Sequence, residues 1–219
     1  MAQPNTSAII VAAGGAHRMG TDKLLAPLHG EPLLQRTLRA FADCAEIGEI
    51  LLIAPAERAA QLVLPAHCRV IAGGAERRDS VWAGLQAAVF PYVAVHDGAR
   101  PLISPEAIQR TIAAAQLHGA AALAKPVTDT LKRATEQLLV TDEQIDRSRL
   151  WSMETPQVAE RSRLVAAYEI ILREQSFVTD EVSALQRAGI VVQLVESLSP
   201  NLKITYPHDL RLAELLLPT

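Results

Sequence analysis

The chain has 219 residues, of which 49% are hydrophobic and 21% charged, and its formal net charge is −3. This composition is typical of one globular α/β domain, and the absence of a basic excess argues against general nucleic-acid binding. The apolar runs are shorter than the roughly 20 residues that span a bilayer, and Met1–Ser7 lacks the basic start of a signal peptide. We therefore expect a cytoplasmic protein without a membrane anchor.

Strand-like and helix-like segments alternate along the first half of the chain. Ser7–Ala13 is apolar and β-branched and is followed by two glycines, which predicts a buried strand that feeds a loop. Pro32 then begins a helix whose apolar residues recur at helical spacing. The segments expected next are a strand at Ile50–Ala54, a helical stretch at Glu57–Leu62, a strand at Arg69–Ala72, a helix at Glu76–Val89 and a strand at Tyr92–His96.

The second half follows the same pattern, with one interruption. Ser104 is a suitable N-cap for a helix that reaches about His118, and Gly119–Ala124 returns as a strand. Lys125–Arg149 is polar, contains β-like runs such as Gln137–Val140 and has no clear core face, so we expect it to leave the domain. The pattern then resumes with a strand at Trp151–Val158, helices at Glu160–Glu174 and Asp180–Ala188, a strand at Ile190–Val195 and a helix that begins at Pro207.

This alternation predicts a single domain over residues 1–219, with residues 125–149 as an excursion. Strands and helices of these lengths form a mostly parallel sheet with helices on both faces. In such sheets ligands bind beyond the carboxyl ends of the strands, so the segments that follow each strand are the candidate binding residues.

The segment after the first strand is rich in glycine and carries two cations. The backbone of Ala12, Ala13, Gly14 and Gly15 can approach an anion closely, and Arg18 and Lys23 add positive charge, which favours a polyphosphate site. The segment is neither a Walker A loop nor a GxGxxG loop. The alternative is a glycine-rich turn with two solvated cations.

Two other strand ends carry candidate residues. Asp97, in the string VHDGARP, is a hard oxygen donor suited to Mg²⁺, although an Asp beside Gly is also common in Asx-turns, and Arg100 could simply pair with it. Gly73 and Gly74 end another strand. They form either a plain turn or bare backbone against which a nucleobase can lie, with Ser80 as a hydrogen-bonding side chain.

Seven strings across the chain together resemble the 2-C-methyl-D-erythritol 4-phosphate cytidylyltransferases of the non-mevalonate isoprenoid pathway. Each string is weak alone, but all seven occur in order. They are AAGxxxRM in the first loop, GGxERxDSVxAGL at Gly73–Leu85, VHDGARP at Val95–Pro101, PVTDTLKR at Pro126–Arg133, DRSRLWxxxTPQ at Asp146–Gln157, TDExSAL at Thr179–Leu185 and NLKIT at Asn201–Thr205.

The resemblance implies a Rossmann-like nucleotidyltransferase fold with a protruding β-arm and a homodimer that exchanges these arms, which are residues 125–149. The implied reaction transfers CMP from CTP to 2-C-methyl-D-erythritol 4-phosphate with Mg²⁺, and pyrophosphate leaves. A ribitol 5-phosphate cytidylyltransferase shares most of these strings and is the first alternative. A noncatalytic nucleotide-binding module is an alternative of another class, but the predicted cations and metal ligand are all present.

The resemblance also implies a role for each matched residue. Arg18, Lys23 and Lys203 are similar to the cations that bind the triphosphate and stabilise the transition state. The other matched positions are Gly73, Gly74 and Ser80 at cytosine and ribose, Asp97 at Mg²⁺, Arg100 at the substrate, and Thr130 and Arg147 on the arm that reaches the partner's methylerythritol phosphate. The fork of an arginine side chain suits the phosphate contact expected at Arg147.

One segment departs from the family pattern. The family's first loop commonly ends in Pro-Lys-Gln, whereas here Met19 is followed by Gly-Thr-Asp-Lys, which also resembles the loop of molybdenum-cofactor guanylyltransferases. Lys23 keeps its expected role in either alignment. For Thr179–Glu181 we expect a structural role, with Thr179 as N-cap and two acids on the helix dipole.

Overall fold

The computed structural model of the chain describes residues 3–14 and 22–217. Its main feature is a seven-stranded sheet. The strands are β1 (Thr6–Val11), β4 (Ile47–Ile53), β5 (Cys68–Ile71), β6 (Tyr92–Asp97), β7 (Ala120–Pro126), β8 (Trp151–Glu160) and β9 (Gln193–Glu196). Their order is β5-β4-β1-β6-β8-β7-β9, and only β8 runs antiparallel to its neighbours. The predicted mostly parallel sheet is therefore confirmed.

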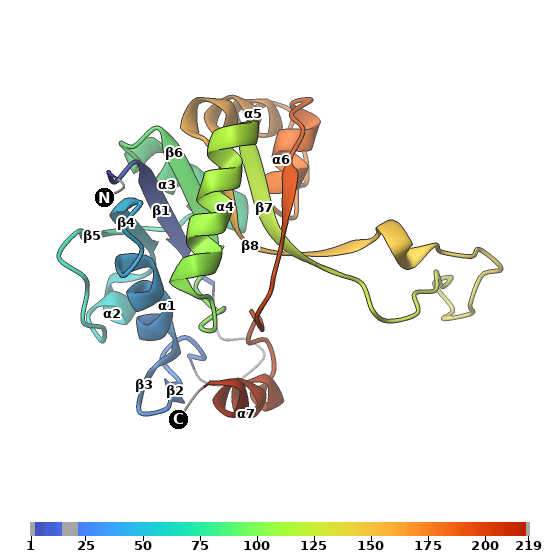
Figure 1. Cartoon of the computed structure of the whole chain (residues 1–219), viewed down its shortest axis with the longest axis horizontal. Coiled ribbons are helices and arrows are strands. Elements are labelled where there is room, and N and C mark those ends of the chain that lie inside the picture. Colours follow the sequence, from blue (N-terminus) through green and yellow to red (C-terminus); the bar gives the residue numbers. More distant parts are fainter. Residues whose placement is uncertain (1–2, 15–21, 218–219) are drawn as a thin grey trace.

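Helices cover both faces of this sheet, as predicted (Figure 1). The helices of the described residues are α1 (Leu33–Ala42), α2 (Ala56–Ala59), α3 (Arg77–Ala87), α4 (Pro105–His118), α5 (Arg161–Arg173), α6 (Glu181–Arg187) and α7 (Pro207–Leu216), of which α7 lies beside β2 and not on a face of the large sheet. Some details differ from the sequence prediction, and strand β9 begins at Gln193 rather than at Ile190. Helix α2 has four residues and ends before Leu62, and a short hairpin of β2 (Pro27–Leu28) and β3 (Glu31–Pro32) precedes α1.

Two apolar cores lie on opposite faces of the sheet. Ile10 of β1 belongs to the core with residues of α1 and α4, and its neighbour Ile9 belongs to the core with residues of α3 and α5. This alternation follows from the strand geometry, in which successive side chains point to opposite faces. Because β1 is buried on both faces, its sequence is a continuous apolar run rather than an alternating one.

Residues 127–149 form an arm that projects from the body of the molecule (Figure 1). Strands β7 and β8 run together toward it, and their last pairs are Lys125 with Ser152 and Pro126 with Trp151. Beyond these pairs, the arm has an isolated bridge between Ala134 and Val140 and a single 3₁₀ turn, so it is less regular than the predicted β-arm. Its exposed large apolar side chains are Leu131, Leu138, Leu139 and Val140.

Candidate active site

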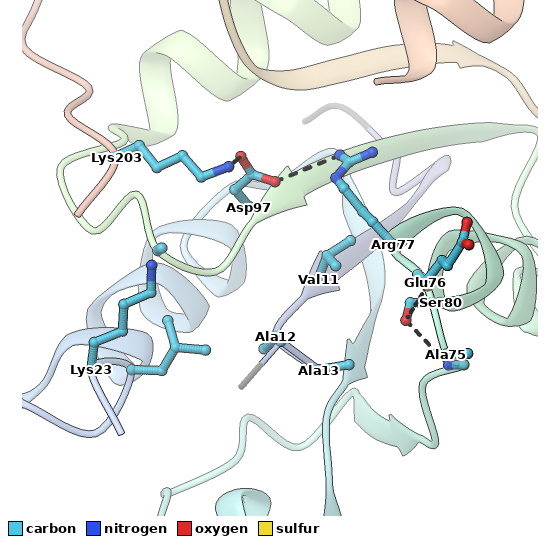
Figure 2. A pocket seen from close by; sticks show the side chains of 14 residues that line it. Val11, Ala12, Ala13, Lys23, Ala75, Glu76, Arg77, Ser80, Asp97 and Lys203 are labelled. Carbon is cyan, nitrogen blue, oxygen red and sulfur yellow. Dashed lines mark hydrogen bonds and ion pairs between the residues drawn. The ribbon is translucent and has the colours of Figure 1, made fainter. Parts of the chain in front are cut away.

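A cavity of about 350 Å³ lies beyond the carboxyl ends of β1 and β6, as the strand-end rule predicts (Figure 2). The loop after β1, the start of α3 and two lysines that are distant in sequence form its walls. Eight residues predicted from the sequence line it, namely Ala12, Ala13, Gly14, Lys23, Gly74, Ser80, Asp97 and Lys203. Residues predicted from distant parts of the sequence therefore line one cavity.

The loop before α3 packs tightly against the loop after β1. A Cβ atom added to Gly73 would lie 2.4 Å from Cβ of Ala13, so only glycine permits this approach. The Oγ of Ser80 accepts a hydrogen bond from the N–H of Gly74 at 3.2 Å and donates one to the carbonyl of Glu76 at 3.2 Å. Ser80 thus holds the loop that forms this wall.

Asp97 lies at the centre of a group of cations. Its carboxylate accepts a hydrogen bond from Nζ of Lys203 at 2.8 Å, and nitrogens of Arg77 and Arg100 lie 3.6 Å and 3.7 Å away. Burial by itself raises the pKa of Asp97, but Lys203 and Arg77 stabilise the ionised form and lower the pKa to about 2. Asp97 is therefore an ionised carboxylate in the wall of the cavity.

Arg77 is held in place by a buried network that the sequence did not reveal. Its guanidinium binds both carboxylate oxygens of Glu181, at 2.8 Å and 3.0 Å, and the hydroxyl of Tyr168 donates to Glu181 at 3.0 Å. The charge of Glu181 raises the pKa of Arg77. The prediction for this segment was wrong in part, because Asp180 is the N-cap of α6 in place of Thr179, and Glu181 pairs with Arg77.

A second cavity, of about 320 Å³, lies on the other side of the same charged wall. Arg77, Asp97 and Lys203 line both cavities. The remaining residues of the second cavity are Arg100, Met153, Glu154, Thr155, Gln157, Thr179 and Asp180. Two adjoining cavities with a shared cationic wall can hold two anionic ligands side by side.

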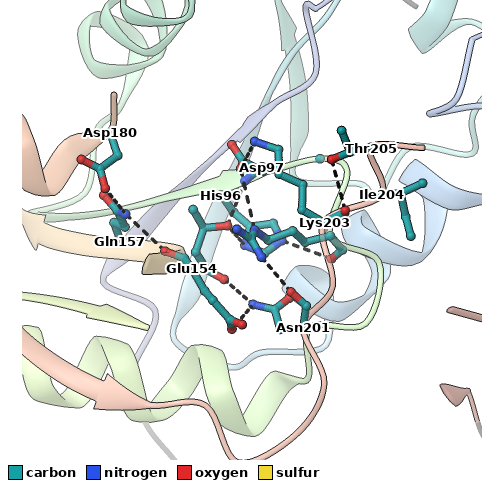
Figure 3. A network of polar contacts seen from close by, with 12 residues as sticks. His96, Asp97, Glu154, Gln157, Asp180, Asn201, Lys203, Ile204 and Thr205 are labelled. Carbon is teal, nitrogen blue, oxygen red and sulfur yellow. Dashed lines mark hydrogen bonds and ion pairs between the residues drawn. The ribbon is translucent and has the colours of Figure 1, made fainter. Parts of the chain in front are cut away.

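Buried hydrogen bonds fix the floor of the second cavity (Figure 3). The Nδ2 of Asn201 donates to Glu154 at 3.1 Å and to the carbonyl of Thr155 at 2.8 Å, and Arg100 donates to the carbonyl of Asn201 at 2.7 Å. His96 lies 2.9 Å from the hydroxyl of Thr155, and burial lowers its pKa to about 3. His96 is therefore neutral and structural.

The remaining predicted residues lie elsewhere. Gly15 and Arg18 lie outside the described residues. Gly73 lines a neighbouring cavity of about 500 Å³ with residues of the β4 and β5 ends. Thr130 and Arg147 are exposed on the arm, where Arg147 donates to the carbonyl of Thr128, and neither lines a described cavity of this chain.

Arg77 and Thr155 are among the residues at the site to which sequence reasoning assigned no role. Arg77 lies inside the string GGxERxDSV, next to glycines that were singled out, so its position at the start of a helix beside a strand end was a usable signal. Thr155 lies inside the string DRSRLWxxxTPQ, next to residues that were matched to the family. Their partners are far away in the sequence, which is why the strings alone did not define their contacts.

Comparison with known proteins identifies the family of the chain. The model of the family described as IspD, 2-C-methyl-D-erythritol 4-phosphate cytidylyltransferase, matches residues 6–219. The chain belongs to this family. A relative of that name from Symbiobacterium thermophilum is 43% identical over 222 residues, which cover 98% of this chain and 94% of the relative. The chain is therefore a cytidylyltransferase, and thus a nucleotidyltransferase.

Solved structures of the family have the same fold. The 2-C-methyl-D-erythritol 4-phosphate cytidylyltransferase of Thermus thermophilus is 33% identical, with a TM-score of 0.81 and coverage of 98% of both chains. The enzyme of that name from Francisella tularensis is 29% identical, with a TM-score of 0.85 and coverage of 97% of this chain and 100% of the other. The sheet with helices on both faces is thus a family feature.

Proposed function

We propose that this chain transfers CMP from CTP to 2-C-methyl-D-erythritol 4-phosphate, giving 4-diphosphocytidyl-2-C-methyl-D-erythritol and pyrophosphate in isoprenoid precursor biosynthesis. The observation that carries the proposal is the wall of Arg77, Asp97 and Lys203 between two cavities. In the first cavity we assign CTP and in the second the acceptor. The family match favours methylerythritol phosphate over ribitol phosphate, and the intact charged wall argues against a noncatalytic module.

The first cavity offers groups suited to each part of CTP. The backbone of Ala12–Gly14 and the ammonium of Lys23 would hold the triphosphate, because glycine-rich backbone and cations both favour a polyanion. We assign the same role to Gly15 and Arg18, which lie outside the described residues. We assign cytosine to the loop of Gly73 and Gly74, which the hydroxyl of Ser80 holds; Gly74 and Ser80 line this cavity, and Gly73 lines the neighbouring one. These assignments keep the roles that the sequence suggested.

The proposed chemistry is electrostatic. A phosphate oxygen of the acceptor attacks the α-phosphorus of CTP in line, the new P–O bond forms, and the bond to pyrophosphate breaks. The attacking oxygen is already ionised near neutral pH, so no general base is needed. Lys23 and Lys203 offset repulsion between the two anions and stabilise charge on the equatorial and leaving oxygens.

Asp97 fits the expected Mg²⁺ ligand. Mg²⁺ sites commonly combine one or two carboxylates with substrate phosphates and water, and Asp97 is an ionised carboxylate that faces the cavity. No cluster of three metal-binding side chains exists in residues 3–14 and 22–217, which agrees with a site completed by phosphates. Bound Mg²⁺ would supply charge neutralisation between the phosphates, and Lys203 would then exchange Asp97 for a phosphate oxygen.

We assign the acceptor to the second cavity, with help from a partner subunit. Arg100 would contact the acceptor from within the chain, and its side chain is already buried beside Asp97. Thr130 and Arg147 of one subunit would reach the cavity of the other. The exposed Leu138 and Leu139 on the projecting arm support such a homodimer, since apolar side chains of this size favour burial at an interface.

We also propose a cytoplasmic location. None of the helices in the described part of the chain has the length and hydropathy of a membrane span.

The decisive experiment measures pyrophosphate release from purified protein with Mg²⁺. CTP, GTP, ATP and UTP are each combined with 2-C-methyl-D-erythritol 4-phosphate and with ribitol 5-phosphate. We expect turnover with CTP and methylerythritol phosphate. The central claim fails if CTP gives no turnover with either acceptor, and the acceptor assignment fails if ribitol phosphate is used with the higher kcat/KM.

Complementation tests the exchanged arm. Arg147→Ala and Lys23→Ala each damage a different part of a shared site. If the arm serves the partner, a mixed dimer contains one site that carries both changes and one intact site. Mixing the two inactive proteins should therefore restore part of the activity. The exchanged-arm assignment is wrong if mixtures stay at the level of the parents while mass spectrometry shows that subunits have exchanged.

A further inference from the structure

Arg58 of the short helix α2 is a buried arginine that contacts the loop after β1. This loop lines the first cavity, to which we assign the nucleotide. The side chain of Arg58 is 8% exposed. Its Nε donates to the carboxylate of Asp22 at 2.6 Å, and its two terminal nitrogens donate to the carbonyls of Ala12 and Gly14, the second at 3.2 Å. All three donor groups of the guanidinium thus have a partner.

These partners lie on both sides of residues 15–21, which the structure does not describe. Ala12 and Gly14 directly follow β1 and line the nucleotide cavity, whereas Asp22 comes immediately before Lys23, which lines the same cavity. The other carboxylate oxygen of Asp22 accepts a hydrogen bond from the N–H of Leu24 at 3.1 Å. One guanidinium therefore fixes the distance between the residues that follow β1 and the residues around Lys23.

The contacts also orient the peptide that faces the ligand. In a planar trans peptide the C=O and the following N–H point in opposite directions. Because Arg58 holds the carbonyl of Ala12, the N–H of Ala13 points away from α2, and Ala13 lines the cavity. A fixed N–H of this kind is suited to an anionic ligand.

We propose that Arg58 is a positioning residue for the triphosphate of the nucleotide, acting through the backbone of Ala12–Gly14 and through Asp22 on Lys23. The inference rests on the proposed function for the identity of the ligand, CTP. Arginine is required because its rigid fork serves three acceptors at once, whereas a lysine ammonium keeps the charge but has no fixed fork. The neighbouring Asp22 neutralises the buried charge.

The test compares Arg58→Gln and Arg58→Lys with the wild type in four measurements: the Kd for CTP by calorimetry, the kcat/KM for CTP, the KM for the acceptor and the thermal unfolding midpoint. We expect the kcat/KM for CTP of Arg58→Gln to fall about a hundredfold, the scale of misplaced binding groups. The KM for the acceptor should change less than about twofold. The kcat/KM for CTP of Arg58→Lys should lie between those of the wild type and Arg58→Gln, because lysine keeps the ion pair with Asp22 and loses the fork.

Arg36→Gln is the matched control. Arg36 also pairs with a carboxylate, Glu31 at 2.8 Å, and its side chain is 18% exposed, but it lines none of the described cavities. A merely structural role for Arg58 predicts that both variants lower the unfolding midpoint and leave the Kd for CTP unchanged. That result overturns the inference.

A further variant keeps the test decisive if Arg58→Gln does not fold. Asp22→Asn preserves the shape of the side chain and removes its charge, so it should weaken CTP binding while Arg58 still holds Ala12 and Gly14. Wild-type turnover with CTP tests the proposed function separately. A wild type that uses CTP, combined with Asp22→Asn and Arg58→Lys variants that bind CTP as the wild type does, overturns only the role of Arg58.

Discussion

Replacing Glu181 with glutamine removes the charge that holds Arg77 at the wall between the two cavities. The side chain of Glu181 is 1% exposed and that of Arg77 is 31% exposed. Removing one partner of a fully buried ion pair costs about 3–5 kcal/mol. Arg77 is partly solvated and keeps Asp97 at 3.6 Å, so we expect the lower value of about 2–3 kcal/mol.

This loss is measurable as a shift in thermal unfolding. For a chain of this size, 1 kcal/mol corresponds to about 2–4 °C, so Glu181→Gln should lower the Tm by about 4–12 °C. Glu174→Gln is the control, because Glu174 forms the same kind of pair with Arg187 at 2.8 Å but both side chains are exposed. Such a surface pair contributes about 0–1 kcal/mol. Equal shifts for the two variants in scanning calorimetry would refute the argument from burial.

Three further predictions follow from the site. Gly73→Ala should weaken CTP binding and lower the Tm, because its Cβ would lie 2.4 Å from Cβ of Ala13; unchanged calorimetric binding would contradict this. Between pH 7 and pH 5 the free energy of unfolding of the wild type, measured in urea, should fall by about 2 kcal/mol more than that of His96→Gln. Burial lowers the pKa of His96 to about 3, so only the unfolded state gains the proton in this range. Equal losses in the two proteins would contradict this. Lys23→Ala or Lys203→Ala should lower kcat by roughly a hundredfold; a change below about fivefold would contradict their role.

Much of the fold was predictable because its signals are local. The apolar run of β1 and the N-cap at Ser104 belong to segments whose own sequence determines their structure. The hairpin of β2 and β3 was missed because strands of two residues have no periodicity to detect. Asp180 was passed over as N-cap because its neighbour Thr179 is an equally good capping residue in sequence.

The site was predictable to the extent that its residues follow strands. Asp97 and the residues around Gly14 lie where the strand-end rule directs attention, and the resemblance added Lys203. Arg58 could not be found in this way, and although the string around Arg77 marked its position, its contacts could not be predicted, because the roles of both arginines depend on partners from other elements. Arg77 and Glu181 are 104 positions apart, and no local pattern reports which carboxylate a given arginine will meet.

The pairing of Pro126 with Trp151 is the last pair between β7 and β8 before the arm begins. The two ends of the arm are therefore fixed neighbours, and the arm is a loop inserted between them. The entropy cost of closing a loop grows only logarithmically, by about 0.6 kcal/mol for each doubling of its length. Natural variants can consequently lengthen, shorten or replace the arm with little penalty to folding of the body. Evolutionary change in this segment is limited by what the arm must reach, and much less by the stability of the sheet that carries it.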